Sequence, residues 1–125
     1  MSQIGTQGAA LVAAIQGTVT DTTFTLTPLD TVEGLTAQAV RVIPVGAEKA
    51  RRNKCGELGL SFNAYLYTPL RGSLTEEDHY TKLEAVMGDM DGLKPTSIQT
   101  MEFMNWEAVK TAQICISVIQ VTFTG

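Results

Sequence analysis

The chain has 125 residues, of which 44% are hydrophobic and 18% charged, and its formal net charge at pH 7 is -4. A chain of this length and composition can bury a hydrophobic core of its own, so we predict a single domain over residues 1–125. The negative charge disfavours a general nucleic-acid binder, because neutralising phosphates requires a basic surface. The mean hydropathy of +0.08 leaves room for apolar surface that is covered only in an oligomer.

The sequence also lacks the signals of membrane, secreted and metal-binding proteins. Its longest strongly apolar stretches, residues 9–15 and 114–121, are shorter than the roughly 20 residues that a membrane-spanning helix needs. No basic segment precedes the alanine-rich stretch near the start, so we expect no secretory signal and a cytoplasmic place of assembly. Cys55 and Cys115 have no metal-ligand spacing and are interpreted as reduced thiols.

The first predicted element is a helix over Gln3 to Ile15, where apolar residues recur at helical spacing among alanines. The threonine-rich stretch from Thr18 to Gly34 predicts a short strand or an ordered loop. Val40 to Val45 alternates between apolar and polar residues, which indicates a strand. Pro44 confines that strand to a sheet edge or to the strand's own end, because proline cannot donate a backbone hydrogen bond.

The next segments combine a strand and a helix. Leu58 to Leu66 places apolar residues at alternate positions, which predicts a half-buried strand. Ser73 and Glu76 have the spacing of a capping box, and we expect the following helix to run from about Thr75 to Asp91. Its predicted buried stripe consists of Tyr80, Leu83, Val86, Met87 and Met90.

Two strands complete the predicted fold. Ser97 to Met104 is expected to form one, followed by a turn near Asn105 and Trp106, and Gln113 to Phe123 is apolar enough for a central strand covered on both faces. The predicted class is therefore α+β, with a mainly antiparallel sheet of about four strands and two helices packed on it. The predicted element order is α-β-β-α-β-β.

The sequence carries no constellation that predicts chemistry. Glu76, Glu77, Asp78 and His79 are adjacent, but acidic residues in a first helical turn favour the helix dipole, and a single histidine lacks partner ligands for a metal. Nucleotide-binding and serine-hydrolase motifs are absent from the sequence. We therefore predict no catalytic residues, no metal and no cofactor, and we interpret Cys55 as a passive loop cysteine.

Charge is unevenly distributed along the chain. Residues 49–54 carry four cations, whereas the predicted second helix is acidic with one lysine, Lys82. The basic segment is either a solvated loop or a binding surface, which the sequence leaves open. If the two regions touch, they do so within a subunit or head to tail between rotated neighbours, which closes a ring. In the second case, charge reversal at Arg51 and Arg52 should lower the oligomeric mass.

Aromatic residues add a second candidate interface. Tyr65 and Tyr67 alternate with the apolar face of their strand, so they mark either an interface or a face covered by the first helix. Trp106 carries the same two interpretations. The predicted subunit or partner interface comprises Lys49, Arg51, Arg52, Lys54, Tyr65, Tyr67, Glu76, Glu77, Asp78 and Trp106.

The order of these elements resembles the tail-terminator and neck proteins, which join head to tail, of tailed bacteriophages. Four segments carry the resemblance: Val42-Ile43-Pro44-Val45, Leu58 to Leu66, Glu77-Asp78 leading to Leu83-Glu84-Ala85-Val86, and Ile114 to Phe123. Such motifs are shared by many small α+β domains, so the resemblance rests on their order over most of the chain.

The resemblance implies a structural, non-enzymatic virion subunit, assembled in the host cytoplasm, that forms a homo-oligomeric ring, usually a hexamer. Such a ring sits at the head-proximal end of the tail and stops tube polymerisation. It contacts the tail-tube protein and the neck or connector proteins, while genome DNA only passes through its lumen. Two alternatives stay open: a head-completion or other neck subunit, and, in another class, a small ligand- or peptide-binding α+β domain.

Overall fold

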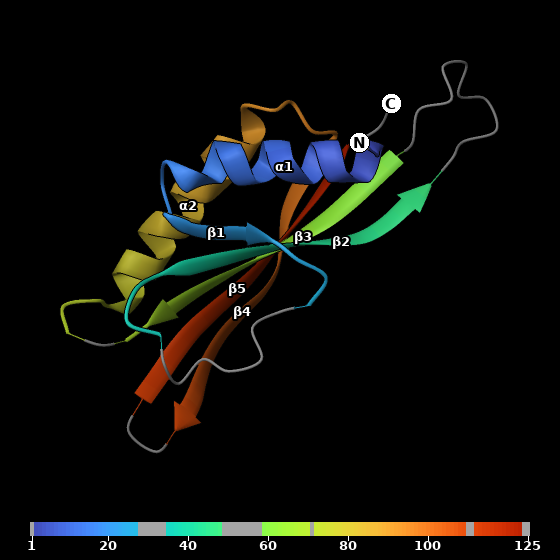
Figure 1. The fold of residues 1–125 in the computed structure, drawn as a ribbon. Helices are drawn as coiled ribbons and strands as arrows, with labels where there is room; N and C mark the ends of the chain where they lie inside the picture. Colours follow the sequence, from blue (N-terminus) through green and yellow to red (C-terminus); the bar gives the residue numbers. More distant parts are fainter. Residues whose placement is uncertain (1, 28–34, 49–58, 71, 110–111, 124–125) are drawn as a thin grey trace.

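The computed structural model describes residues 2–27, 35–48, 59–70, 72–109 and 112–123 as two helices and a five-stranded sheet (Figure 1). The sheet order is β1-β2-β3-β5-β4. The predicted α+β class is confirmed. The elements are α1 (Gln3–Gln16), β1 (Asp21–Phe24), β2 (Ala39–Glu48), β3 (Gly59–Pro69), α2 (Glu76–Asp91), β4 (Ser97–Val109) and β5 (Ala112–Phe123).

The predicted sheet differs in detail from the observed one, which has five strands rather than about four, a different element order, and one parallel pair in a mainly antiparallel sheet. Within the stretch for which the sequence left a short strand or an ordered loop open, Asp21–Phe24 form a strand, so the element order is α-β-β-β-α-β-β. This strand runs parallel to β2, whereas the other neighbouring strands pair antiparallel.

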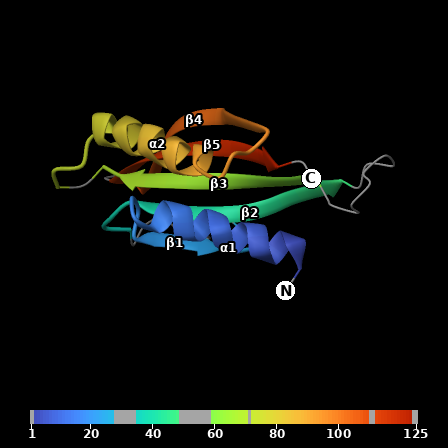
Figure 2. The same cartoon turned by 90° about the horizontal axis from the view of Figure 1, so that it is seen from above.

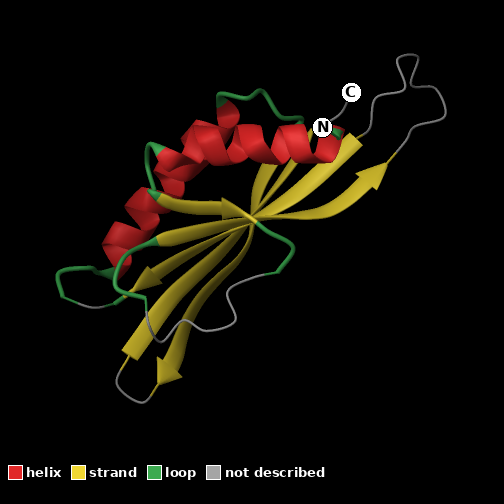
Figure 3. Cartoon of the chain, in the orientation of Figure 1, coloured by secondary structure: helices red, strands yellow, loops and turns green. Residues whose placement is uncertain are grey.

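Both helices lie on one face of the sheet (Figure 2). α1 packs over β1 and β2, and α2 packs over β3, β5 and β4, so the opposite face carries no helix (Figure 3). The core fills the space between the helices and the sheet. Its buried members are Leu11, Ile15, Val19, Val40, Val42, Leu60, Phe62, Ala64, Leu66, Leu83, Val86, Met90, Ile119 and Val121.

Strand β3 confirms the alternation seen in the sequence. Leu60, Phe62, Ala64 and Leu66 are buried beneath the helices, while Leu58 lies outside the described residues. The Phe62 ring lies 6.1 Å from that of Phe24 and 6.2 Å from that of Phe123, measured between centroids. The alternation therefore identified the face on which the helices pack.

Pro44 lies where the sheet has a local edge. β1 pairs only with Ala39–Val42, so the later part of β2 has no outer strand among the described residues. The pairing of β2 with β3 also shifts between Pro44 and Gly46. A missing backbone donor is tolerated at an edge and a bulge, which agrees with the predicted edge position.

Gly8 marks a close approach of α1 to the sheet. A Cβ at Gly8 would lie 2.6 Å from the Phe24 ring, whereas nothing lies within 4 Å of a Cβ at Gly88 in α2. We expect Gly8→Ala to lower the free energy of unfolding by about 1–3 kcal/mol through overpacking. The matched control Gly88→Ala should raise it by about 0.5–1 kcal/mol. Urea titrations measure both, and a stabilising Gly8→Ala would contradict this contact.

Helix α2 begins at a cap two residues later than predicted. Asp78 N donates to Thr75 Oγ1 at 3.3 Å, and Thr75 N donates to Asp78 Oδ2 at 2.8 Å, so the capping box joins Thr75 to Asp78. The predicted box of Ser73 and Glu76 is wrong. The segment Ser73-Leu-Thr-Glu-Glu-Asp78 contains two overlapping candidates, and the structure uses the second.

The cap position can be tested with two alanine substitutions. We expect Thr75→Ala to lower the free energy of unfolding by about 1 kcal/mol, because a helix N-terminal donor loses its acceptor. Ser73 is exposed and makes no cap, so Ser73→Ala should change it by less than about 0.5 kcal/mol. Thermal or urea unfolding distinguishes the variants, and equal effects would count against the Thr75 cap.

The final hairpin differs from its prediction in one respect. Asn105 and Trp106 do not form a turn, because β4 continues through Val109 and pairs them with Cys115 and Ile114. β5 lies between β3 and β4, as expected of a central strand. Its residues from Ile114 to Ile119 are all buried, which confirms the prediction of cover on both faces.

Candidate functional site

The predicted interface residues fall into several regions, and the basic segment is the first. Lys49, Arg51, Arg52 and Lys54 lie outside the described residues, as does Cys55. The strand residues that flank this segment, Glu48 and Gly59, pair with each other at one end of β2 and β3. The structure therefore fixes where the basic segment is anchored.

The acidic first turn of α2 lies at the opposite end of the sheet. Glu76, Glu77 and Asp78 are exposed there, beyond the far end of β3 (Figure 1). An 11-residue strand spans about 35 Å. A contact within one subunit between the basic segment and this turn would have to span that length.

The outer face of α2 keeps its acidity along the helix. Glu77, Glu84 and Asp91 are exposed and pair with no cation in the described part of the chain. The ion pair in the described part of the chain joins Arg41 Nη1 of β2 to Asp21 Oδ1 of β1 at 3.0 Å. It lies at the β1 edge of the sheet and does not involve α2. Because the carboxylates of Glu77, Glu84 and Asp91 have no cationic partner among the described residues, the acidic helix face is a candidate surface for a neighbouring molecule.

Tyr65 and Tyr67 lie on the face of the sheet that carries no helix. Their rings stack with centroids 6.3 Å apart and planes inclined by 17°. The alternative that α1 covers them is wrong, because α1 packs on the other face. Tyr67 is only 3% exposed and packs with Ile114, Ile116 and Leu35, so it is a less accessible interface residue than predicted.

The rest of that face carries uncharged polar residues where β3, β5 and β4 pair. Gln99 Nε2 donates to Gln120 Oε1 at 3.2 Å, and Ser61 and Thr122 share a hydrogen bond of 3.3 Å. Asn63 pairs in register with Gln120, and its Oδ1 is covered without a hydrogen-bond partner. Trp106 belongs to β4, but its side chain lies outside the description.

His79 was interpreted as part of the acidic cluster, but it points into the core. Its Nδ1 lies 2.6 Å from Thr68 Oγ1 of β3 and its Nε2 lies 2.8 Å from Ser117 Oγ of β5. Gln38 Nε2 donates to the same Thr68 hydroxyl at 3.0 Å. His79 is 1% exposed and takes the place predicted for Tyr80, which is 43% exposed. These contacts join α2 to two strands.

The network does not have the form of a catalytic site. A serine beside a histidine is a possible nucleophile and base, but Ser117 and Thr68 are fully buried and the second histidine nitrogen contacts a hydroxyl rather than a carboxylate. Burial lowers the pKa of His79 from its ordinary value of 6.5, because imidazolium loses hydration. Burial, and then the charge of Glu76, raises the pKa of the Cys115 thiol.

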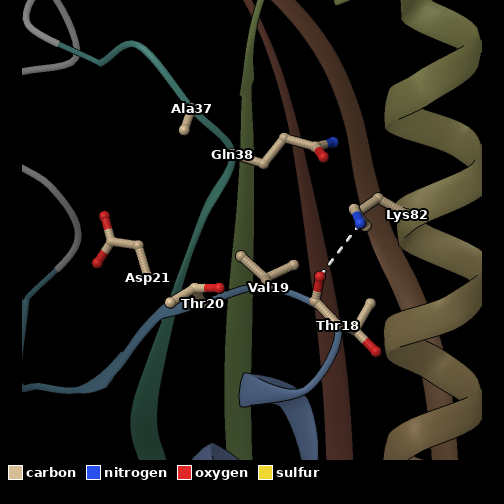
Figure 4. Close-up of a pocket in the computed structure, with 7 residues that line it drawn as sticks. All are labelled: Thr18, Val19, Thr20, Asp21, Ala37, Gln38 and Lys82. Carbon is tan, nitrogen blue, oxygen red and sulfur yellow. Dashed lines mark hydrogen bonds between the residues drawn. The ribbon is translucent and has the colours of Figure 1, made fainter.

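A pocket of about 310 Å³ lies between the start of β1, the approach to β2 and α2 (Figure 4). Lys82 points toward Thr18 and donates to its backbone oxygen at 3.1 Å, while Asp21 points away from Lys82. The Thr18 hydroxyl donates to Asp89 at 2.5 Å. Several polar groups here are therefore already bonded within the protein. The lining residues are Thr18, Val19, Thr20, Asp21, Ala37, Gln38 and Lys82.

The described residues contain no group of three or more histidine, cysteine, aspartate or glutamate side chains placed to hold a metal ion. Neither helix in this part of the chain has the length and apolar character needed to cross a membrane.

No model of a protein family and no curated protein matches its sequence.

Proposed function

We propose that this chain is a structural virion subunit that forms a ring at the head-proximal end of a phage tail. It ends tail-tube polymerisation and joins the tail to the neck, without catalysis and without a cofactor. The succession of a leading helix, the β2 and β3 hairpin, an acidic-start helix and a closing hairpin supports this function, because the resemblance rests on that order.

The observation that carries the proposal is the separation of two charged regions along the strands. The basic segment is anchored at one end of β2 and β3, and the acidic first turn of α2 lies at the other end. In a ring whose axis follows the strands, one ring face then carries the strand ends that flank the basic segment and the opposite face carries the carboxylates. Two unlike faces suit a subunit that meets the tube on one side and the neck on the other.

With a ring axis along the strands, the opposite charges do not meet between neighbours in the same ring. Copies placed side by side around such an axis keep like ends level, so unlike ends meet between stacked rings or with a partner protein. Arg51→Glu with Arg52→Glu should then leave the ring mass unchanged and abolish higher, stacked species. A fall to monomer mass would instead support the contact between neighbours within one ring.

Light scattering after size exclusion tests the proposal itself. We expect the wild-type chain, of 13.4 kDa, to elute at a closed multiple of that mass that stays constant over a range of concentrations. A mass of one subunit at every concentration, with the fold intact by circular dichroism, would contradict ring formation.

Two alternatives have some support. A neck or head-completion subunit needs the same two unlike faces. Binding to purified tail tubes supports the tail-terminator position, whereas binding to connectors alone supports the neck position. The pocket favours a small ligand-binding domain, but its volume is at the lower limit of about 300–1,000 Å³ for ligand pockets. The internal bonds of Lys82 and Thr18 also leave it fewer groups for a ligand.

A further inference from the structure

The sheet ends in two strands that have no outer neighbour among the described residues. β1 forms one edge and β4 forms the other. β4 is 13 residues long, whereas β1 has four. Among the described residues, β4 presents backbone donors and acceptors without a strand partner on its outer side, and β1 presents fewer, because Thr22 N already donates to Thr20 O and Thr22 O accepts from Gln16 Nε2.

The directions of the two edge strands are complementary. β1 is parallel to β2, and each further neighbouring pair across the sheet is antiparallel. β4 therefore runs antiparallel to β1. When copies are related by a rotation about an axis along the strands, each strand keeps its direction along that axis. β4 of one copy therefore meets β1 of the next copy as an antiparallel pair, which is more stable than a parallel pair.

The register also places the two edges at the same height. Thr23 pairs with Arg41, Arg41 with Tyr65, Tyr65 with Val118, and Val118 with Glu102. The four residues of β1 are thus level with the middle of β4. Copies related by a rotation alone bring these two stretches together without a shift along the strands.

The edges carry little protection against pairing. β4 contains no proline or lysine, and its middle, Met101-Glu-Phe-Met-Asn-Trp106, is mostly apolar. Its pairing with β5 shifts near each end, which leaves Glu102 to Glu107 in continuous register. Leu26, two residues beyond β1, is 81% exposed, the largest exposure among the large hydrophobic side chains described.

We propose that β4 of one copy pairs antiparallel with β1 of the next copy, which joins neighbouring sheets around the ring. This inference rests on the proposed function and names the contact that closes it. The alternative is a two-fold symmetric contact in which the β4 edges of two copies pair with each other. It leaves both β1 edges open, whereas the β4–β1 contact occupies both edges of every subunit.

Cysteine cross-linking tests the contact. In a Cys55→Ser background, Thr23→Cys is combined in turn with Gln99→Cys, Glu102→Cys and Met104→Cys, three positions that share a sheet face by register. Within one subunit Thr23 and Glu102 are separated by four strand spacings, about 19 Å, too far for a disulfide. We expect at least one pair, with Thr23→Cys/Glu102→Cys the first choice, to give a ladder of oligomers on a non-reducing gel.

The controls separate the outcomes. Either single variant, and Ala13→Cys on the exposed side of α1 combined with Glu102→Cys, should give at least tenfold less ladder. If light scattering shows a ring but no pair gives a ladder, the edge contact is overturned and the proposed function stands. If Glu102→Cys alone stops at dimers, the two-fold contact replaces it. If the chain is monomeric, both proposals fail.

Discussion

Replacing His79 with leucine should lower the free energy of unfolding by about 3 kcal/mol, the largest effect that we expect of a single substitution here. Leucine has a similar volume but cannot bond to Thr68 Oγ1 or Ser117 Oγ, which lie 2.6 Å and 2.8 Å from the histidine nitrogens. Both hydroxyls belong to fully buried residues, so water cannot replace the lost partner. Urea titration at pH 7.5 and one protein concentration measures the loss.

An all-apolar variant is the matched control for this prediction. Combining His79→Leu with Thr68→Val and Ser117→Ala removes both hydroxyls that lose their histidine partner in the single variant. Because the main cost comes from buried groups without partners, the triple variant should recover at least half of the lost stability. If the destabilising effects of the three substitutions instead add, the lost hydrogen bonds of the network do not explain the destabilisation by His79→Leu.

Acid should weaken the fold through the same histidine. The pKa of His79 is lowered in the folded protein, so the unfolded chain binds more protons as pH falls below the ordinary value of 6.5. The stabilisation is fully present above pH 6.5 and is lost between that value and the lowered pKa. For one proton, the free energy of unfolding falls by at most about 1.4 kcal/mol per pH unit.

His79→Gln provides the control for the acid effect. Urea titrations from pH 7.5 to 5.5 should show a falling free energy of unfolding for the wild type and a flat one for His79→Gln. Glu76, Tyr80 and Lys82 lie on the same helix and Cys115 lies on β5, and because all four remain in His79→Gln, the difference between the two slopes belongs to His79. An equal slope in both proteins would assign the effect to another group.

The sequence predicted elements whose pattern is set locally. β3 has a strict alternation and β5 a continuous apolar run, and both formed where they were expected. β1 has four residues, DTTF, without a comparable pattern, and its pairing with β2 depends on residues distant in the chain. The cap at Thr75 was missed because two sequences for a capping box overlap.

The position of His79 was hidden by its charged neighbours. It follows three acidic residues, yet its spacing to Leu83, Val86 and Met90 is that of one helix face. Thr68 likewise continues the alternation from Leu60 to Leu66, and Ser117 interrupts an apolar strand. These polar residues at core positions were the available signal, because buried polar groups require partners. Which of them meet depends on the packing of α2 across the sheet.

Negative-stain electron microscopy of the purified chain tests ring formation most directly. The account predicts closed rings of uniform diameter with a stain-filled centre, at the concentration where light scattering gives a constant multiple of 13.4 kDa. Particles of single subunits, or open filaments without closure, would contradict it.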